Sequence, residues 1–241
     1  MRKLGLIGGM SWASTAIYYE KINRGVRWRL GGHSNAPLIL ESLDFDPIAK
    51  ALVAGEWDWL GDHLADAAKR LERSGAEGIM LCSNTMHKLY DHVASAVSVP
   101  VLHVADATVA AIRADGVSRA ALLGTRFTMR EGFLRERLQG QGVTLSMPAP
   151  ERMAEIDRII FDELVQGDAR VESKRTMRTV IAELQKAGDE AVVLGCAELA
   201  LIVNPTSNVL PIYDTTSLHA GAALEWVLDE RMPAQAMAAA N

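Results

Sequence analysis

The chain contains two cysteines, and each one ends a short apolar run. Cys82 follows Gly78-Ile79-Met80-Leu81 and enters a polar segment, and Cys196 follows Ala191-Val192-Val193-Leu194-Gly195 in the same way. Such a run is typical of a buried strand, and in open α/β sheets ligands bind beyond the carboxyl ends of the strands. A thiol has a pKa of about 8.5 that its surroundings can lower toward neutrality. The pattern therefore predicts two acid–base groups at a ligand site.

Two thiols on opposite sides of one small substrate would suit the inversion of a stereocentre next to a carboxylate. One group takes a proton from one face while the other returns a proton to the opposite face. Such catalysis favours pKa values near the working pH, and the enolate-like charge requires preorganised donors. Backbone N–H groups of the loops and nearby hydroxyls or amides would supply these donors, from Ser83, Asn84, Thr85 and Thr125.

A glycine-containing loop follows the first expected strand, with the sequence Gly8-Gly9-Met10-Ser11. Two glycines allow a tight turn and a close approach to a ligand, although a plain turn is nearly as consistent with them. Ser11 or Ser14 would cap the next helix, whose N-terminus could bind a carboxylate. The spacing is not that of a dinucleotide or P-loop motif, which argues against a nucleotide.

Composition excludes several classes of protein. The chain has 241 residues, 49% of them hydrophobic, so a large core is expected, and its net charge of -5 with no Lys/Arg cluster argues against a nucleic-acid partner. No apolar run is long enough to span a membrane, and no secretion signal is visible, so we expect a cytoplasmic protein. In that compartment both thiols stay reduced, and two cysteines are too few for a structural zinc site, so no metal is expected.

Strands and helices are expected to alternate, which is the pattern of an α/β protein with parallel sheets covered on both faces. Asp44 to Pro47 is expected to be a loop. Strands are expected at about 3–7, 37–42, 78–82, 99–103, 119–123, 143–147, 191–196 and 210–214, and helices at about 15–29, 57–74, 85–96, 129–139, 154–166, 172–187 and 215–228.

Three landmarks recur at nearly constant spacing. Gly8 and Gly124 are 116 residues apart, the two cysteines 114, and Pro100 and Pro211 111. This duplication predicts two pseudo-symmetric lobes with the active site in the cleft between them. The expected domains are residues 1–104 plus 209–230, residues 105–208, and a flexible tail at 231–241.

The glycine loop, Cys82-Ser83-Asn84-Thr85-Met86-His87 and Gly195-Cys196-Ala197-Glu198 together resemble the signature loops of the cofactor-independent aspartate/glutamate racemase superfamily. The similarity extends from Leu4 to about Leu228 and is greatest to the aspartate racemase branch and its broad-specificity amino-acid racemases. It implies a homodimer that racemises a small amino acid without pyridoxal phosphate or metal. By motif position Cys82 and Cys196 become the catalytic residues, and the expected substrate contacts are Met10, Ser11, Ser83, Asn84, Thr85, Thr125, Ala197 and Glu198.

The chain departs from the family pattern at three places that bear on the substrate. Ala197 stands where the family has Thr, no Arg occurs in Phe45-Asp46-Pro47-Ile48, and Gln166 stands where some relatives have Lys. Loss of both cations weakens the case for an acidic side chain, so a neutral or varied side chain is a serious option. Arg126 would compensate only if it turned inward.

Other activities of the superfamily stay open, namely hydantoin racemisation, maleate isomerisation and malonate decarboxylation, as do a non-catalytic sensor of carboxylate metabolites and a thiol redox protein. His87 and Lys88 are expected at the surface. Glu198 is equally consistent with tuning Cys196 and with a plain charge at a helix start.

Overall fold

The computed structural model describes residues 1–229, and these form two compact units. Unit 1 contains residues 1–103 and, among the described residues, 219–229, whereas unit 2 contains Val104–Leu218. The tail expected at 231–241 lies outside the described residues. Within residues 1–229, no helix combines the length and apolar character that crossing a membrane requires.

Unit 1 is built on a parallel sheet with the strand order β2-β1-β3-β4. The inner strands β1 and β3 are buried along their whole length, because they have neighbours on both edges and helices on both faces. The elements of this unit are β1 (Leu4–Gly8), α1 (Trp12–Leu30), β2 (Leu38–Ser42), α2 (Phe45–Ala54), α3 (Trp57–Arg73), β3 (Gly78–Leu81), the 3-10 helix η1 (Thr85–Leu89), α4 (Tyr90–Ser95), β4 (Val101–Leu102) and most of α10 (Thr215–Leu228).

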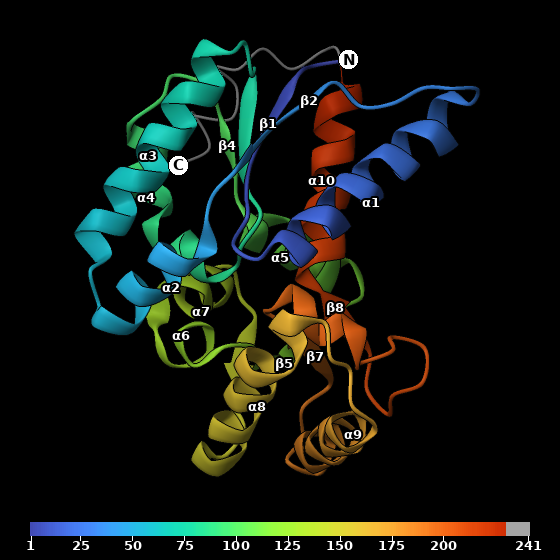
Figure 1. Ribbon diagram of the computed structural model, residues 1–241. Coiled ribbons are helices and arrows are strands. Elements are labelled where there is room, and N and C mark those ends of the chain that lie inside the picture. Colours follow the sequence, from blue (N-terminus) through green and yellow to red (C-terminus); the bar gives the residue numbers. More distant parts are fainter. Residues whose placement is uncertain (230–241) are drawn as a thin grey trace. The chain divides into compact units, whose positions relative to one another are not determined.

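The two faces of this sheet are covered by different helices (Figure 1). Helices α1 and α10 pack on the face that carries Leu4, Leu6 and Met80, and Cys82 belongs to the same cluster. Helix α3 covers the other face, where a Cβ added at Gly5 would lie 3.1 Å from the Leu71 side chain. Alternation along the strand therefore directs the Cys82 side chain toward α1 and α10.

Unit 2 is built on a second parallel sheet, with the strand order β6-β5-β7-β8. Its inner strand β7 is fully buried. The elements are α5 (Val104–Ala114), β5 (Arg119–Leu123), α6 (Arg126–Arg130), α7 (Gly132–Gln139), β6 (Thr144–Ser146), α8 (Pro150–Asp162), the 3-10 helix η2 (Leu164–Gln166), α9 (Val171–Lys186), β7 (Ala191–Leu194), the 3-10 helix η3 (Ala197–Leu201), β8 (Ile212–Asp214) and the first residues of α10.

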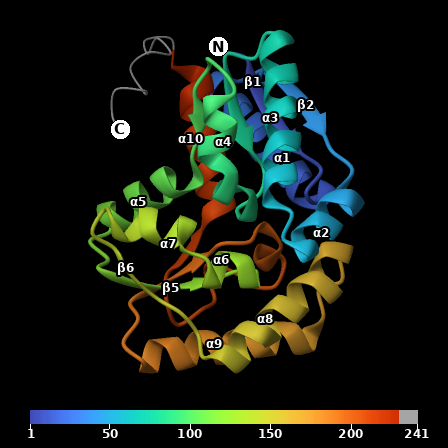
Figure 2. The same ribbon diagram turned by 90° about the vertical axis from the view of Figure 1, so that its left-hand side faces the viewer.

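Two apolar clusters fill the faces of the second sheet. Val192 and Leu194 of β7 pack with α8 and α9, in a cluster that also contains Cys196. Ala191 and Val193 point to the opposite face, where α5 and α7 cover them. Figure 2 shows α8 and α9 on one side of this sheet and α5 with α7 on the other.

The two units repeat one plan. The order β2-β1-β3-β4 corresponds element by element to β6-β5-β7-β8. Cys82 follows β3, and Cys196 follows β7 after one glycine. The predicted fold class of two α/β lobes, each with a parallel sheet between helices, is confirmed.

The boundary between the units differs from the expected one. Residues 209–218 were expected in the first lobe, but β8 pairs with β7, with Ile212 opposite Val192. The duplication itself accounts for this, because Pro211 corresponds to Pro100 and each precedes the fourth strand of its own sheet. Helix α10 then continues into unit 1 from His219.

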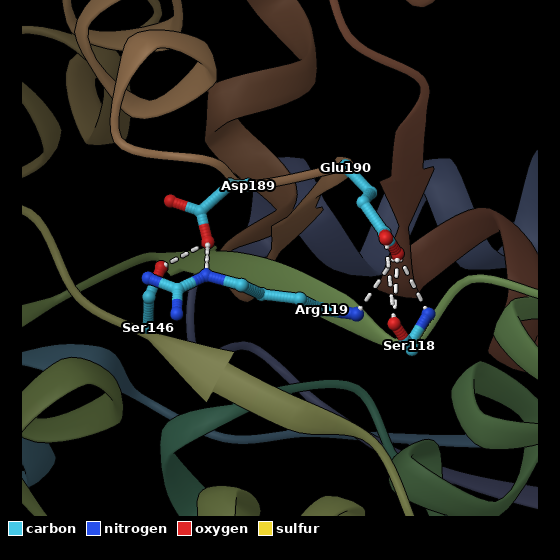
Figure 3. Close-up of polar contacts among 5 residues, drawn as sticks. All are labelled: Ser118, Arg119, Ser146, Asp189 and Glu190. Atoms are coloured by element: carbon cyan, nitrogen blue, oxygen red, sulfur yellow. Dashed lines mark hydrogen bonds and ion pairs between the residues drawn. The ribbon is translucent and has the colours of Figure 1, made fainter.

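Two adjacent carboxylates stabilise the second sheet at the end where β5 and β7 begin (Figure 3). Glu190 accepts hydrogen bonds from the backbone N–H groups of Ser118 (2.8 Å) and Arg119 (3.1 Å). Asp189 accepts from Arg119 Nε at 3.0 Å and from Ser146 Oγ at 2.6 Å. These contacts join the starts of β5 and β7 to the end of β6, and they lie at the opposite end of the strands from the cysteine.

Helices α2 and α5 are among those that were not predicted. Asp44 to Pro47 is not a loop, because Asp44 caps α2 and accepts a hydrogen bond from the Asp46 N–H at 3.2 Å. Pro47 is tolerated there since the first turn of a helix has no intrahelical partner for its N–H groups. Helix α5, Val104–Ala114, follows β4 directly in a segment for which we predicted no helix.

Candidate active site

Cys82 lies at the end of β3, at the centre of the first sheet. Its side chain is fully buried, and its backbone N–H donates to Ile7 O at 2.9 Å, extending the pairing of β3 with β1. Ser14 Oγ, from the first turn of α1, lies 3.4 Å from the Cys82 carbonyl oxygen and donates to it. Burial raises the pKa of the Cys82 thiol well above its usual value, so the thiol is neutral in the free protein.

The glycine loop lies against this cysteine and takes a shape that requires glycine. Gly9 has a φ of +87°, and a Cβ there would collide with the Leu43 backbone. Its N–H donates to Thr15 Oγ1 at 2.8 Å. Ser11 is the residue that caps α1, as its hydroxyl accepts from the Ser14 N–H at 3.3 Å. The predicted contacts Met10 and Ser11 are both buried in this loop.

A buried histidine fixes the polar loop after Cys82. His87 was expected at the surface, but it is only 3% exposed, and its Nδ1 lies 2.8 Å from Ser83 O. A carbonyl oxygen only accepts, so Nδ1 carries the proton and donates it. Ser83 is half-buried, and Asn84 and Thr85 are buried at the start of η1. His87 therefore holds in place the loop that carries three predicted substrate contacts.

His87 belongs to a cluster of three buried histidines. Its ring lies 4.7 Å from that of His103 and 5.4 Å from that of His219. His219 Nε2 donates to Leu102 O at 3.2 Å, which leaves Nδ1 to accept from the Tyr18 hydroxyl, also at 3.2 Å. Burial, together with His87, lowers the pKa of His219 well below its usual value. The cluster thus links α1, β4, η1 and α10 beneath the Cys82 loop.

Cys196 has a different partner from Cys82. Its Sγ lies 3.0 Å from Glu198 Oε2 and donates to it, and both side chains are buried. Glu198 thus contacts the thiol and is not merely a charge at the start of η3, which decides between the two readings of the sequence. Burial first, and then Glu198, raise the pKa of the Cys196 thiol well above its usual value. The backbone N–H groups of Glu198 and Leu199 act on the sulfur in the opposite direction.

A second glycine and threonine arrangement supports Cys196. A Cβ added at Gly195 would lie 2.7 Å from Thr128 Cγ2, and one at Gly124 would lie 3.0 Å from Gly195 O. Thr125 is buried and caps α6, accepting from the Thr128 N–H at 3.3 Å. The structure therefore brings the predicted contact Thr125 close to the predicted contacts Ala197 and Glu198, which are buried in η3.

Arg126, the cation that sequence reasoning left undecided, has an exposed side chain. Its guanidinium carbon lies 4.9 Å from the centroid of the Phe127 ring, and its backbone N–H donates to Asp157 Oδ1 at 2.7 Å. Within unit 2 this side chain makes a cation–π contact with its neighbour.

The sequence indicated His103 and His219 as possible partners of site residues, with a purely structural role as the alternative, but it gave no sign of the roles of His87 and Tyr18 in supporting the Cys82 loop. Their residue types are visible in the sequence, but their convergence depends on four elements from both ends of unit 1. No three His, Cys, Asp or Glu side chains form a metal-ligand group within residues 1–229. Each unit brings together a buried thiol and buried hydroxyl groups, to which unit 1 adds the Asn84 amide and unit 2 the Glu198 carboxylate.

The chain matches known proteins along most of its length. The family model described as Asp/Glu/Hydantoin racemase matches residues 7–223. The broad specificity amino-acid racemase RacX of Bacillus subtilis (strain 168) is 23% identical over 228 residues, 89% of this chain and 93% of that protein. A crystal structure of a candidate Asp/Glu racemase from Yersinia pestis is similar with a TM-score of 0.89 and 41% identity, covering 95% of this chain and all of that one.

An aspartate racemase homologue from Pyrococcus horikoshii OT3 has a TM-score of 0.84 and 32% identity, with 95% of this chain and all of that one covered. These matches confirm the resemblance to the superfamily and to its aspartate racemase branch. The chain belongs to the Asp/Glu/hydantoin racemase family.

Proposed function

We propose that the protein is a cofactor-independent amino-acid racemase in which Cys82 and Cys196 exchange protons with one α-carbon from opposite faces. The observation that carries this proposal is the repetition of a buried thiol after the third strand of each sheet. Each thiol is accompanied by a glycine-containing loop and a buried threonine or serine. A reaction that used only one thiol would not require the second arrangement.

The protonation states support this assignment of roles. Burial raises the pKa of both thiols, so each can donate a proton in the free protein. A reaction in either direction needs one thiolate and one thiol, and the two enantiomers exchange these roles. The proposed substrate contacts are Met10, Ser11, Ser83, Asn84, Thr85, Thr125, Ala197 and Glu198.

We propose a substrate range that is not limited to acidic side chains. The Bacillus subtilis relative is a broad specificity amino-acid racemase. In this chain the segment Phe45–Ile48 contains no arginine and forms the first turn of α2. Arg126 contacts Phe127. A homodimer and a cytoplasmic location complete the proposal, with a small amino acid as ligand and neither nucleic acid nor membrane as partner.

A racemisation screen tests the proposal. Each common amino acid is incubated as a single enantiomer with the purified protein, without added cofactor, and both enantiomers are measured by chiral chromatography. We expect the opposite enantiomer of at least one amino acid to accumulate toward an equal mixture. Turnover of a hydantoin, maleate or malonate in the absence of any amino-acid turnover would replace this function with another activity of the family. Binding of an amino acid without turnover would indicate a sensor.

A further inference from the structure

We propose that Ser14 and Thr15, two hydroxyl residues in the first turn of α1, are positioning residues for the reaction. Thr15 holds the glycine loop in one shape, and Ser14 ties that loop to Cys82. Neither Ser14 nor Thr15 is among the proposed substrate contacts. The inference rests on the proposed function, because the loop carries two of those contacts and Cys82 is a proposed catalytic residue.

Thr15 closes the glycine loop with one hydroxyl group. Its Oγ1 accepts a hydrogen bond from the Gly9 N–H at 2.8 Å and donates to the Ser11 carbonyl oxygen, also at 2.8 Å. A hydroxyl can donate and accept at once, so a single side chain fixes both ends of the segment that contains Met10. Thr15 is 4% exposed, so water has little access to either hydrogen bond.

The fit of Thr15 explains why glycine is required at position 8. Gly8 has no positive φ, so its backbone conformation alone would admit other residues. A Cβ built there would lie 2.4 Å from Thr15 Cγ2 and 2.7 Å from Thr15 Oγ1, which is closer than side-chain atoms approach in folded proteins. Strand β1 therefore ends in a glycine because the methyl and hydroxyl groups of Thr15 occupy the space beside it.

Ser14 connects the same loop to the end of β3. Its Oγ lies 3.1 Å from the Ser11 carbonyl oxygen and 3.4 Å from the Cys82 carbonyl oxygen. A serine hydroxyl carries one hydrogen, so the two carbonyl oxygens share it, which accounts for the longer distance. The Cys82 N–H donates to Ile7 O at 2.9 Å. The backbone of this cysteine is therefore held by β1 on one side and by α1 on the other.

Unit 2 repeats a hydroxyl residue at the corresponding place. Thr128 lies three residues after the cap Thr125, as Ser14 lies three residues after the cap Ser11. A Cβ added at Gly195, directly before the second cysteine, would lie 2.7 Å from Thr128 Cγ2. In both units, the first turn of a helix thus places a hydroxyl residue against the backbone beside a cysteine. Its recurrence at both proposed catalytic thiols supports a role in placing them.

The two residues should affect different kinetic constants. Thr15 shapes the loop that carries Met10 and Ser11, and contacts of this kind act on the ground state and the transition state alike, so their loss raises KM. Ser14 sets the position of the Cys82 backbone. Misplacement of a proton-transfer group slows the chemical step, so the loss of Ser14 should lower kcat.

The first test measures amide hydrogen exchange by NMR in the protein without substrate. The Gly9 N–H should be protected, because Thr15 Oγ1 accepts its hydrogen bond. Thr15→Val keeps the shape of the side chain but removes the hydroxyl, and it should raise the Gly9 exchange rate by about two- to tenfold, the range that one hydrogen bond provides. Thr15→Ser keeps the hydroxyl and should preserve the protection.

Thr179→Val is the matched control, since the exposed Thr179 hydroxyl donates to Arg175 O within α9. This variant should leave the Gly9 exchange rate unchanged. A Gly9 N–H that exchanges freely in the unmodified protein would overturn the proposal, and that result does not depend on the folding of any variant. Unchanged Gly9 protection in Thr15→Val would overturn it as well.

The second test measures steady-state kinetics with an amino acid that the unmodified protein racemises. Thr15→Val should raise KM by about two- to tenfold with a smaller change in kcat, and Thr15→Ser should recover most of the affinity. Ser14→Ala should lower kcat by about 10–10²-fold. Ser95→Ala removes an exposed serine hydrogen bond to His92 O and should leave kcat unchanged.

Thermal melting of each variant separates positioning from stability. A Ser14→Ala variant that melts at a lower temperature but keeps its kcat would show that Ser14 serves the fold alone. A Thr15→Ser variant as impaired as Thr15→Val would show that only the methyl contact matters. Absence of turnover in the unmodified protein would instead overturn the proposed function, whereas the exchange rates would still decide whether Thr15 holds the glycine loop.

Discussion

The two cysteines occupy equivalent positions in two sheets but differ in their electrostatic surroundings. Cys82 is fully buried among apolar residues of α1 and α10, with its carbonyl oxygen contacted by Ser14. Cys196 donates to Glu198. Replacing Cys82 and replacing Cys196 should therefore slow the same reaction, each by removing a different proton transfer.

Replacing Cys82 or Cys196 by alanine is expected to lower kcat/KM by about 10²–10⁴-fold, the usual contribution of a general acid or base. Alanine fills most of the cysteine volume, so the fold should persist, which circular dichroism can verify. Chiral chromatography gives the rate of each variant. A variant that racemises at the rate of the unmodified protein would remove that cysteine from the chemistry.

At the level of single residues, the sequence identified the groups with reactive chemistry better than their surroundings. The thiols stand out because each ends an apolar run, whereas the sequence left the cap of α1 open between Ser11 and Ser14 and the structure assigns it to Ser11. His87 was misjudged because it lies in a polar stretch, Ser83 to Lys88, in which nothing indicates burial. Its burial depends on His103 and His219, which are distant in sequence.

The loops after the strands depend on contacts from other elements. The Cys82 loop is held by Ser14 from α1 and by His87 from η1, and the Cys196 loop packs on Thr128 of α6. Catalytic groups need placement to within a fraction of an ångström, so these supports should influence the rate.

His87→Ala should lower kcat/KM by about 10–10²-fold, because the Ser83 carbonyl loses its donor and the Cys82 loop can shift. His87→Asn keeps an N–H donor at nearly the same distance along the side chain and should recover most of the rate. Steady-state kinetics and thermal melting should be measured for both variants. If the asparagine variant is as slow as the alanine variant while both melt alike, the hydrogen bond to Ser83 has no positioning role.

Asp189 supports the other end of the second sheet. Asp189→Ala should lower the free energy of unfolding by about 1–3 kcal/mol, because the half-buried Ser146 hydroxyl and the Arg119 side chain lose their acceptor. Asp168→Ala is the matched control, since Asp168 forms an exposed pair with Arg170 and should contribute at most about 1 kcal/mol. Urea denaturation measures both changes. Equal losses would show that the edge contacts in Figure 3 do not anchor the sheet.

At the level of elements, periodicity predicted the strands and the long helices, but short or polar segments were harder. Helix α2 was read as a loop because Asp44 and Pro47 are also turn residues, and both are equally suited to a helix start. Strand β4 has only two residues, which hid the start of α5 directly after it.

The whole chain repeats one four-stranded plan, and that repetition could be read from three pairs of landmarks in the sequence. The unit to which β8 belongs was harder to predict. Helix α10, which follows β8 in the chain, begins in unit 2 and continues in unit 1. Chain order alone suggested that strand and helix belong together, whereas strand pairing divides them.

The buried titrating groups predict how stability depends on pH. The pKa of His219 is lowered in the folded protein, so below about pH 6.5 the unfolded chain binds a proton that the folded chain does not. The free energy of unfolding should therefore fall as pH drops, by up to about 1.4 kcal/mol per pH unit.

The thiol pKa values of Cys82 and Cys196 are raised, so above about pH 8.5 the unfolded chain loses protons that the folded chain keeps. Stability should fall again there as pH rises.

Urea denaturation at a series of pH values checks this dependence. His219→Gln should flatten the acid side, and Cys82→Ala should reduce the slope on the alkaline side. A stability that stays constant from about pH 5 to 10 would contradict the burial of these groups.

The central claim is that two different groups act on one α-carbon, and the position of deuterium tests it most directly. One enantiomer is incubated in deuterated water and stopped at low conversion, and both enantiomers are then separated and analysed by mass spectrometry. With two separate thiols, the newly formed enantiomer should carry one α-deuterium while the remaining starting enantiomer carries almost none. Equal deuterium in both enantiomers, or product that keeps its original proton, would show that a single group serves both faces and would contradict the account.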